Sequence, residues 1–201
     1  NYITITGGKF KINKYFQASD LFDKQKYLEF KRKNEDEIIK MLDLKIKKAI
    51  KNHLISDARV GLTCSGGIDS SLIVKYANDI NKSFTIFTNV SPGIEKLSKI
   101  VPKVMQINKI NKNRSIYIKQ NKKKYFKNLS YLTKTSLFPA RWGGGPPMKE
   151  LCENAKRIKI KVLLGGEGLD EYFCGYNTFY KSLNKKEKFD LHTILSLNKR
   201  F

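Results

Sequence analysis

Two short glycine-rich segments carry the residues of this chain that could do chemistry. Residues 65–71 read Ser-Gly-Gly-Ile-Asp-Ser-Ser, and residues 165–171 read Gly-Gly-Glu-Gly-Leu-Asp-Glu. Glycine lets the backbone approach a ligand closely, and successive backbone N–H groups ahead of a helix can surround anionic oxygens. Serine hydroxyls can bond the same oxygens, and the aspartates can hold Mg²⁺ between protein and phosphates. The pattern therefore indicates a nucleotide phosphate site.

The elements around these segments support that interpretation. Apolar runs of β type precede both, at residues 59–64 and 160–164. Open α/β sheets bind nucleotides at the carboxyl ends of such strands. The first segment is not the usual Walker loop, because it lacks the G-x-x-x-x-G-K-[ST] spacing and its lysine.

Both segments resemble signatures of known enzymes. The first is similar to the S-G-G-x-D-S loop of ATP pyrophosphatases, which cleave ATP between the α and β phosphates. Residues 162–176, V-L-L-G-G-E-G-L-D-E-Y-F-C-G-Y, resemble the second signature of the asparagine synthetase family, S-G-E-G-x-D-E-L-F-G-G-Y. Residues 56–61 resemble that family's approach to its loop. The two motifs lie about a hundred residues apart and in the family's order.

The resemblance implies an ATP-dependent amide-forming ligase, or amidotransferase, with ATP and Mg²⁺ as cofactors. Such an enzyme activates a carboxylate as an acyl-adenylate with release of pyrophosphate, and ammonia or an amine then attacks. The expected substrate is a small carboxylate, aspartate by default, or a carboxylate on a sugar or peptide. The expected ammonia source is a glutaminase domain or subunit.

The resemblance also assigns the site residues. Glu167 is the expected catalytic residue, because a carboxylate there could take a proton from the attacking nitrogen. Asp69 and Asp170 are the expected metal ligands. The residues expected to bind the nucleotide are Leu62, Ser65, Gly66, Gly67, Asp69, Ser70, Ser71, Phe87, Gly165 and Gly166.

Two positions depart from the family pattern. Gly165 stands where the second motif normally begins with serine, which removes a hydroxyl near the nucleotide. Cys64 stands where serine or leucine is usual. The three cysteines lack the spacing of a disulfide framework or a zinc site, so we interpret them as free thiols.

Composition and charge leave two other functions open. The formal net charge is +22, with 34 lysines and six arginines. RNA sites favour arginine and aromatic stacking, so we attribute the charge to a compositional bias toward lysine and do not expect nucleic-acid binding. A tRNA-modifying ATPase with the same loop, or a noncatalytic nucleotide- or RNA-binding module, remains possible on sequence alone. No run of 18 apolar residues occurs, which favours a cytoplasmic protein.

The chain is long enough for one compact domain with a sizeable core. We expect an α/β fold, a parallel sheet with helices on both faces of the adenine-nucleotide α-hydrolase type, preceded by a β-hairpin. By resemblance, residues 1–16 are this hairpin, the last edge of an amino-terminal glutaminase domain. Residues 17–33 are a charged connector, and residues 34–201 are the synthetase domain, expected to be incomplete at its C-terminal end.

Periodicity supplies the remaining elements. Asn34 and Glu37 form a capping-box pattern ahead of an amphipathic helix that reaches Leu54. Further strands are expected at 84–87 and 104–107, and further helices at 69–80, 94–101, 125–135 and 148–158. Residues 108–124, which include a short strand-like run at 115–119, are expected to form a loop. Residues 140–147 are expected to form no regular element, and the segment after Tyr176 a weak helix.

Overall fold

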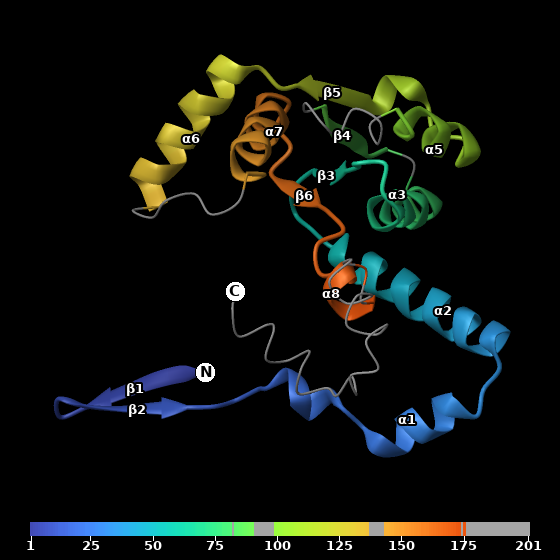
Figure 1. The fold of residues 1–201 in the computed structure, drawn as a ribbon, viewed down its shortest axis with the longest axis vertical. Coiled ribbons are helices and arrows are strands. Elements are labelled where there is room, and N and C mark those ends of the chain that lie inside the picture. The colour runs from blue at the N-terminus through green and yellow to red at the C-terminus, as the bar shows by residue number, and fades with distance from the viewer. Residues whose placement is uncertain (82, 91–98, 137–142, 174, 176–201) are drawn as a thin grey trace, which may run out of the picture. The chain divides into compact units, whose positions relative to one another are not determined.

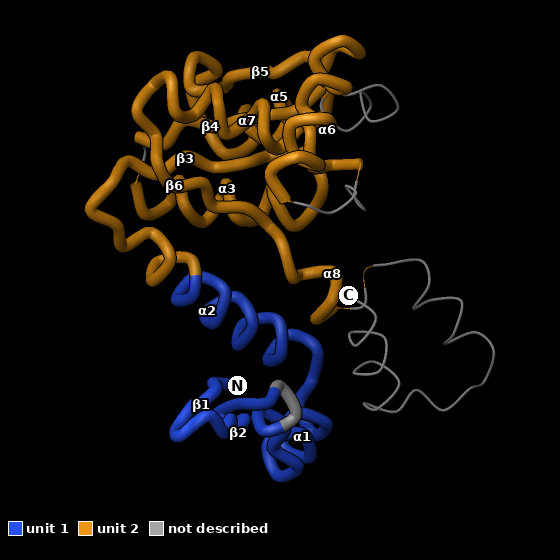
Figure 2. The backbone as a smooth tube through the Cα atoms, turned by 90° about the vertical axis from the view of Figure 1, so that its left-hand side faces the viewer, with its two compact units in different colours: residues 1–49 blue, residues 50–201 orange. Residues whose placement is uncertain are grey.

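The computed structural model describes residues 1–81, 83–90, 99–136, 143–173 and 175, with the side chains of Ala18 and Ser19 left out (Figure 1). The chain divides into two compact units, residues 1–49 and 50–201 (Figure 2). Each unit is described separately below. Nothing in this division tests whether residues 1–16 belong to a glutaminase domain, which stays a prediction.

The first unit begins with the predicted hairpin. Strands β1 (Tyr2–Thr6) and β2 (Lys9–Asn13) pair antiparallel. Gly7 and Gly8 form the turn with φ of 57° and 72°, a backbone region that glycine enters at no steric cost.

The role of residues 17–33 as a charged connector stays a prediction. This stretch contains a short 3-10 helix, η1 (Ala18–Leu21), and the helix α1 (Lys24–Lys31). The Asp23 carboxylate caps α1 by accepting hydrogen bonds from the backbone N–H groups of Gln25 and Lys26. The N-cap signal was present in the sequence and was masked by the high charge of the segment.

Helix α2 (Glu35–His53) starts at the predicted capping box. The Glu37 backbone N–H donates to Asn34 Oδ1 at 2.9 Å, and the Asn34 backbone N–H donates to Glu37 Oε2 at 3.0 Å. The first turn is acidic and the last carries Lys51 and His53, which complements the helix dipole. The boundary between the two units falls within this helix.

The second unit is built on four strands in the order β5-β4-β3-β6, and every neighbouring pair is parallel. Their bounds are β3 (Val60–Thr63), β4 (Thr85–Val90), β5 (Ser115–Lys119) and β6 (Val162–Leu164). Parallel strands end at one edge, so all four carboxyl ends lie together. The predicted fold class is confirmed.

Helices cover both faces of this sheet. Phe87 on β4 packs against α7 (Gly145–Arg157), behind which lies α6 (Lys122–Ser136). Leu62 and Ile86 point to the opposite face, where α3 (Ile68–Ile80) and α5 (Val101–Ile107) lie. The Ser115 hydroxyl, on the same face as Ile86, contacts Met105 Sδ of α5 at 2.7 Å. Figure 1 shows these two helix pairs on either side of the strands.

Two predicted elements between β4 and α6 were wrong. Residues 104–107 belong to α5, not to a strand, and Val101 and Met105 are buried one helical turn apart. The third strand is β5, inside the stretch that was expected to be a loop. β5 is an edge strand, and Ile118 is its one buried side chain. The strand-like run at 115–119 was assigned to a loop because the residues around it are rich in lysine and asparagine.

The helix before the second motif begins three residues earlier than predicted. Helix α7 begins at Gly145, inside the stretch 140–147 that was expected to be irregular, because Pro146 and Pro147 occupy its first turn. Most of the helix expected at 94–101, up to residue 98, and the helix expected after Tyr176 lie outside the described residues. Among the helices that are described, none has the length and apolar character needed to span a membrane.

Candidate functional site

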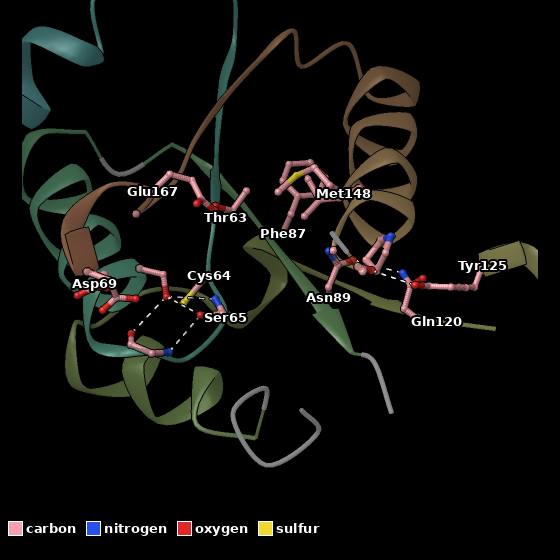
Figure 3. A pocket seen from close by; sticks show the side chains of 18 of the residues that line it. Thr63, Cys64, Ser65, Asp69, Phe87, Asn89, Gln120, Tyr125, Met148 and Glu167 are labelled. Atoms are coloured by element: carbon pink, nitrogen blue, oxygen red, sulfur yellow. Dashed lines mark hydrogen bonds between the residues drawn. The ribbon is translucent and has the colours of Figure 1, made fainter. Parts of the chain in front are cut away.

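A cavity of about 820 Å³ lies at the carboxyl edge of the parallel sheet (Figure 3). Each of the four strands contributes a residue at or just beyond its end: Thr63 from β3, Asn89 from β4, Gln120 after β5 and Gly166 after β6. Helices α6 and α7 supply a further wall that includes Tyr125 and Met148. The cavity therefore occupies the position at which open α/β sheets bind ligands.

The loop that follows β3 is held in shape by its own serines. The Ser70 hydroxyl donates to the Gly67 carbonyl at 3.2 Å and accepts from the Ser65 backbone N–H at 3.2 Å. The Ser65 hydroxyl lies 3.1 Å from that of Ser70 and accepts from the Gly67 backbone N–H. Gly66 adopts φ of 91°, which a residue with a side chain rarely does. This bracing fixes the cradle at the start of α3.

The two motifs meet at Gly166. A Cβ on this residue would lie 3.1 Å from Asp69 Cβ and 3.2 Å from the Ser70 backbone nitrogen. The backbone of the second motif therefore lies against the first turn of α3, where a side chain on residue 166 would be crowded. Gly168, with φ of 95°, then turns the chain into the short helix α8 (Leu169–Phe173).

Carboxylates gather where the motifs meet. The pKa of Asp69 is raised, first by burial and then by the negative charges of Asp170 and Glu171. Gly175 packs so closely on Asp170 that a Cβ there would collide with its carboxylate. Among the described residues that line the cavity are four carboxylates, including Glu167, and one lysine, Lys122.

This acidic lining stands out in a chain with a net charge of +22. Uncompensated carboxylates at close range repel, and a bound cation relieves the repulsion. Within the described part of the chain, no group of three or more His, Cys, Asp or Glu side chains is placed to hold a metal alone. A cation here would therefore take part of its coordination from a ligand or water, as Mg²⁺ bound to phosphates does.

The cavity brings together most of the predicted site residues. Those that line it are Ser65, Gly67, Asp69, Ser70, Phe87, Gly166, Glu167 and Asp170. Leu62, Gly66, Ser71 and Gly165 are not among its lining residues, and Leu62 is buried on the opposite face. The roles assigned to all of these residues stay predictions.

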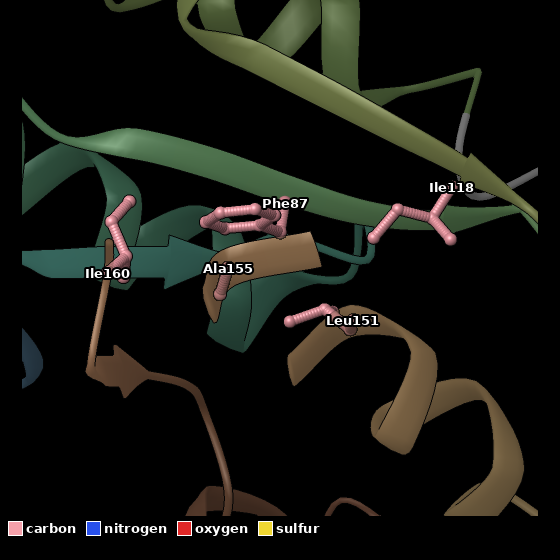
Figure 4. Close-up of a cluster of buried hydrophobic side chains, with 5 residues drawn as sticks. All are labelled: Phe87, Ile118, Leu151, Ala155 and Ile160. Atoms are coloured by element: carbon pink, nitrogen blue, oxygen red, sulfur yellow. The ribbon is translucent and has the colours of Figure 1, made fainter. Parts of the chain in front are cut away.

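Phe87 belongs to both the cavity and the core (Figure 4). Its ring packs with Ile118, Leu151, Ala155 and Ile160. A Cβ on Gly61 of the neighbouring strand would lie only 2.8 Å from Cε2 of this ring, so the strand needs glycine at that point. The ring is therefore rigidly placed as the apolar floor of the cavity.

Sequence reasoning missed the far wall of the cavity. Gln120 Nε2 donates to Asn89 Oδ1 at 3.4 Å, and Gln120 Oε1 is buried without a hydrogen-bond partner in the described part of the chain. Asn89 lies near the end of β4 and Gln120 directly follows β5, so the two amides meet only because these strands are neighbours in the sheet. Other residues that it missed are Thr63, Cys64, Asn121, Lys122, Tyr125, Phe126, Gly143, Gly144, Pro147, Met148, Leu151, Gly168 and Glu171.

The thiol of Cys64 is a buried group at the cavity. Burial raises its pKa, and the Gly66 N–H and the Ser70 and Ser71 hydroxyls only partly oppose that effect. Cys152 is exposed. Because the thiolate is the reactive form, iodoacetamide should label Cys152 at least about tenfold faster than Cys64 in the native protein. Peptide mass spectrometry measures both rates, and equal native rates would contradict the buried placement of Cys64.

Comparisons with known proteins agree with these motifs. The sequence profile of the asparagine synthase family matches residues 41–200. The chain is 30% identical over 169 residues to glutamine-hydrolyzing asparagine synthetase 1 of Bacillus subtilis, covering 76% of this chain and 24% of that protein. It is 28% identical over 160 residues to glutamine-hydrolyzing asparagine synthetase B of Escherichia coli, a match that covers 71% of this chain and 28% of that protein. The chain thus spans about a quarter of the length of these relatives.

Among solved structures, the U34-tRNA thiolase NcsA of Methanococcus maripaludis is similar to 82% of this chain and 64% of its own, with a TM-score of 0.46 and 19% identity. A structural likeness at that level supports no argument about function. The match to the family profile is stronger evidence, because it covers most of the chain and includes both glycine-rich motifs. The predicted family is confirmed, and the chain belongs to the asparagine synthase family.

Proposed function

We propose that this chain is the ATP-dependent core of an amide-forming ligase of the asparagine synthetase type. The observation that supports this most is the contact of the two motifs at Gly166, which joins the braced loop of residues 65–70 to Glu167 and Asp170 in one cavity. A noncatalytic nucleotide-binding module would need the loop but not the second set of carboxylates.

In this proposal the cavity residues have three tasks: binding phosphates, holding the metal and accepting a proton. Backbone N–H groups of the loop bind the β and γ phosphates, which leave together as pyrophosphate. Asp69 and Asp170 hold Mg²⁺, which when bound neutralises charge that develops on the leaving group. Glu167 accepts a proton from the attacking nitrogen. Phe87 and Met148 exclude water from the apolar side of the cavity.

The reaction then runs in two steps. A carboxylate oxygen of the substrate bonds to the α phosphorus of ATP, and the bond to the bridging oxygen of the β phosphate breaks. Ammonia or an amine next bonds to the acyl carbon, AMP leaves, and the nitrogen loses its proton to Glu167. Aspartate is the proposed substrate by family, and the proposed ammonia source is a glutaminase domain, as in the glutamine-hydrolyzing relatives.

The products formed when ATP is cleaved distinguish this proposal from other ATP-dependent activities. The full-length protein should release one AMP and one pyrophosphate for each amide formed, because the loop holds the phosphates beyond the α position. Chromatography of nucleotides with a coupled pyrophosphate assay measures both. Release of ADP and phosphate would contradict the proposal. Release of AMP that requires tRNA, and no carboxylate, would instead favour the tRNA-modifying alternative.

A further inference from the structure

A second hollow lies between helices α6 and α7, the pair shown together in Figure 1. It has a volume of about 670 Å³ and shares no lining residue with the cavity at the sheet edge. We call this hollow the basic groove. The described residues that line it are Lys124, Lys127, Asn128 and Tyr131 from α6, and Lys149, Glu153, Lys156 and Arg157 from α7.

Contacts between the two helices fix the shape of the basic groove. Lys124 on α6 pairs with Glu150 on α7, whose side chain is buried. The Asn128 side chain, also buried, donates to the Pro146 carbonyl at 3.4 Å. The spacing of the two walls is therefore set by the fold and does not depend on a ligand.

The basic groove holds more positive charge than its own carboxylate balances. Its five cations face one lining carboxylate, Glu153, which pairs with Lys149. The pKa of Glu153 is lowered, first by its hydrogen bond from Lys149 and then by the charges of neighbouring groove cations. Lys127, Lys156 and Arg157 form no ion pair with a described carboxylate. Like charges held close repel, and an anion in the groove would relieve that repulsion.

This excess differs from the general abundance of lysine in the chain. On α2 and α3, lysines pair with an aspartate one turn away on the same helix, as in Lys47 with Asp43 and Lys75 with Asp79. Helix α6 contains five lysines and no acidic residue. Its groove-facing lysines therefore depend on α7, or on a partner, for opposite charge.

The cations form two rows along the groove. On α6, Lys124, Lys127 and Tyr131 share one helical face, and on α7 Lys149 and Lys156 do the same. Each row covers two turns of helix, or about 10 Å. An extended peptide advances about 3.3 Å per residue, so roughly three residues would span the groove and present carboxylates to both rows.

We propose that the basic groove binds an acidic segment of a partner protein, in extended conformation. Lysine ammonium groups are point charges that need no forked acceptor, so single carboxylates suit them. A nucleic acid fits less well, because it favours arginine and open aromatic faces, whereas the Lys149 ammonium lies over the Tyr131 ring at 4.5 Å. The groove lies outside the catalytic cavity, so this binding does not rest on the proposed function.

Fluorescence anisotropy of dye-labelled hexaglutamate tests the proposal on the full-length protein. The triple variant Lys127→Gln/Lys156→Gln/Arg157→Gln removes the three groove cations that have no ion pair. It should weaken hexaglutamate binding about tenfold at low salt, the combined effect of three exposed charge pairs. Binding to the wild type should weaken as salt is added, and hexaglutamine should not bind. ATP cleavage should be the same in both proteins.

Lys99→Gln/Lys103→Gln/Lys112→Gln is the matched control. It removes the same number of charges from exposed lysines that do not line the groove, so hexaglutamate affinity should change little. Equal losses in the two triple variants would overturn the inference, because net charge alone would then explain the binding. Wild-type affinity in the groove variant, or a wild type that does not bind hexaglutamate, would overturn it as well.

Carbodiimide cross-linking of hexaglutamate to the wild type locates the peptide without any substitution. Mass spectrometry should find the new amide bonds at the four groove lysines, Lys124, Lys127, Lys149 and Lys156. Cross-links spread evenly over other lysines would contradict a defined site. An oligouridylate that binds more tightly than hexaglutamate, and that loses its affinity in the groove variant, would assign the groove to nucleic acid and reject the acidic protein segment.

Discussion

Glu167→Gln should abolish amide formation while leaving ATP binding nearly intact. The side chain lines the cavity between Gly166, which is packed against α3, and Gly168, whose φ of 95° fixes the turn. Glutamine keeps the size of the side chain but cannot accept a proton. General bases typically contribute about 10²–10⁴-fold, so amide formation should fall at least about a hundredfold. ATP affinity and single-turnover amide formation are measured separately.

Glu153→Gln is the matched control for this variant. Glu153 lies on α7, pairs with Lys149 and does not line the cavity, so its loss should leave both steps unchanged. Normal turnover in Glu167→Gln would show that Glu167 is only part of the turn. Loss of ATP binding would place it among the nucleotide or metal ligands instead.

Asp69→Asn and Asp170→Asn should each reduce turnover at least about tenfold, because each removes a charged group that we propose as a ligand for Mg²⁺. Asp69 lies in the first turn of α3 and its carboxylate is close enough to Asp170 for their charges to interact. An amide keeps the shape of either side chain, so folding should be unaffected. Turnover is measured across a magnesium titration, in which both variants should require more metal.

Asp79→Asn provides the comparison within the same helix. Asp79 is exposed on α3, pairs with Lys75 and does not line the cavity, so neither turnover nor metal dependence should change. If Asp69→Asn and Asp170→Asn both retained the magnesium dependence of the wild type, the two aspartates would not share a metal.

Sequence patterns predicted the parts of the fold that have strong local signals. The strands before the two motifs, the hairpin and the capping box at Asn34 all follow from short stretches of sequence. β5 and α5 were misassigned because their apolar stretches are very short and fit either a strand or a helix until their neighbours are known. The order of the strands, with β3 between β4 and β6, is a property of tertiary packing and has no local signal.

The residues of the cavity likewise divide into those with a local sequence signal and those placed only by tertiary packing. The motif residues were found because glycine and carboxylate spacing has a direct chemical reason. Thr63, Asn89 and Gln120 were not found, because each becomes part of the cavity only when strands distant in sequence lie side by side. The close approach of the Thr63 hydroxyl to Gly165 is of this kind, since the two residues are about a hundred positions apart.

The hydrogen bonds among Ser65, Gly67 and Ser70 make the loop a preorganised receptor. A flexible glycine-rich loop would lose about 1–2 kcal/mol of backbone entropy for each residue that a ligand ordered. Here that entropy is already lost when the protein folds, so an incoming phosphate group meets donors in place. In the proposed function, the serines therefore contribute to phosphate affinity through rigidity, even where their hydroxyls never touch the ligand.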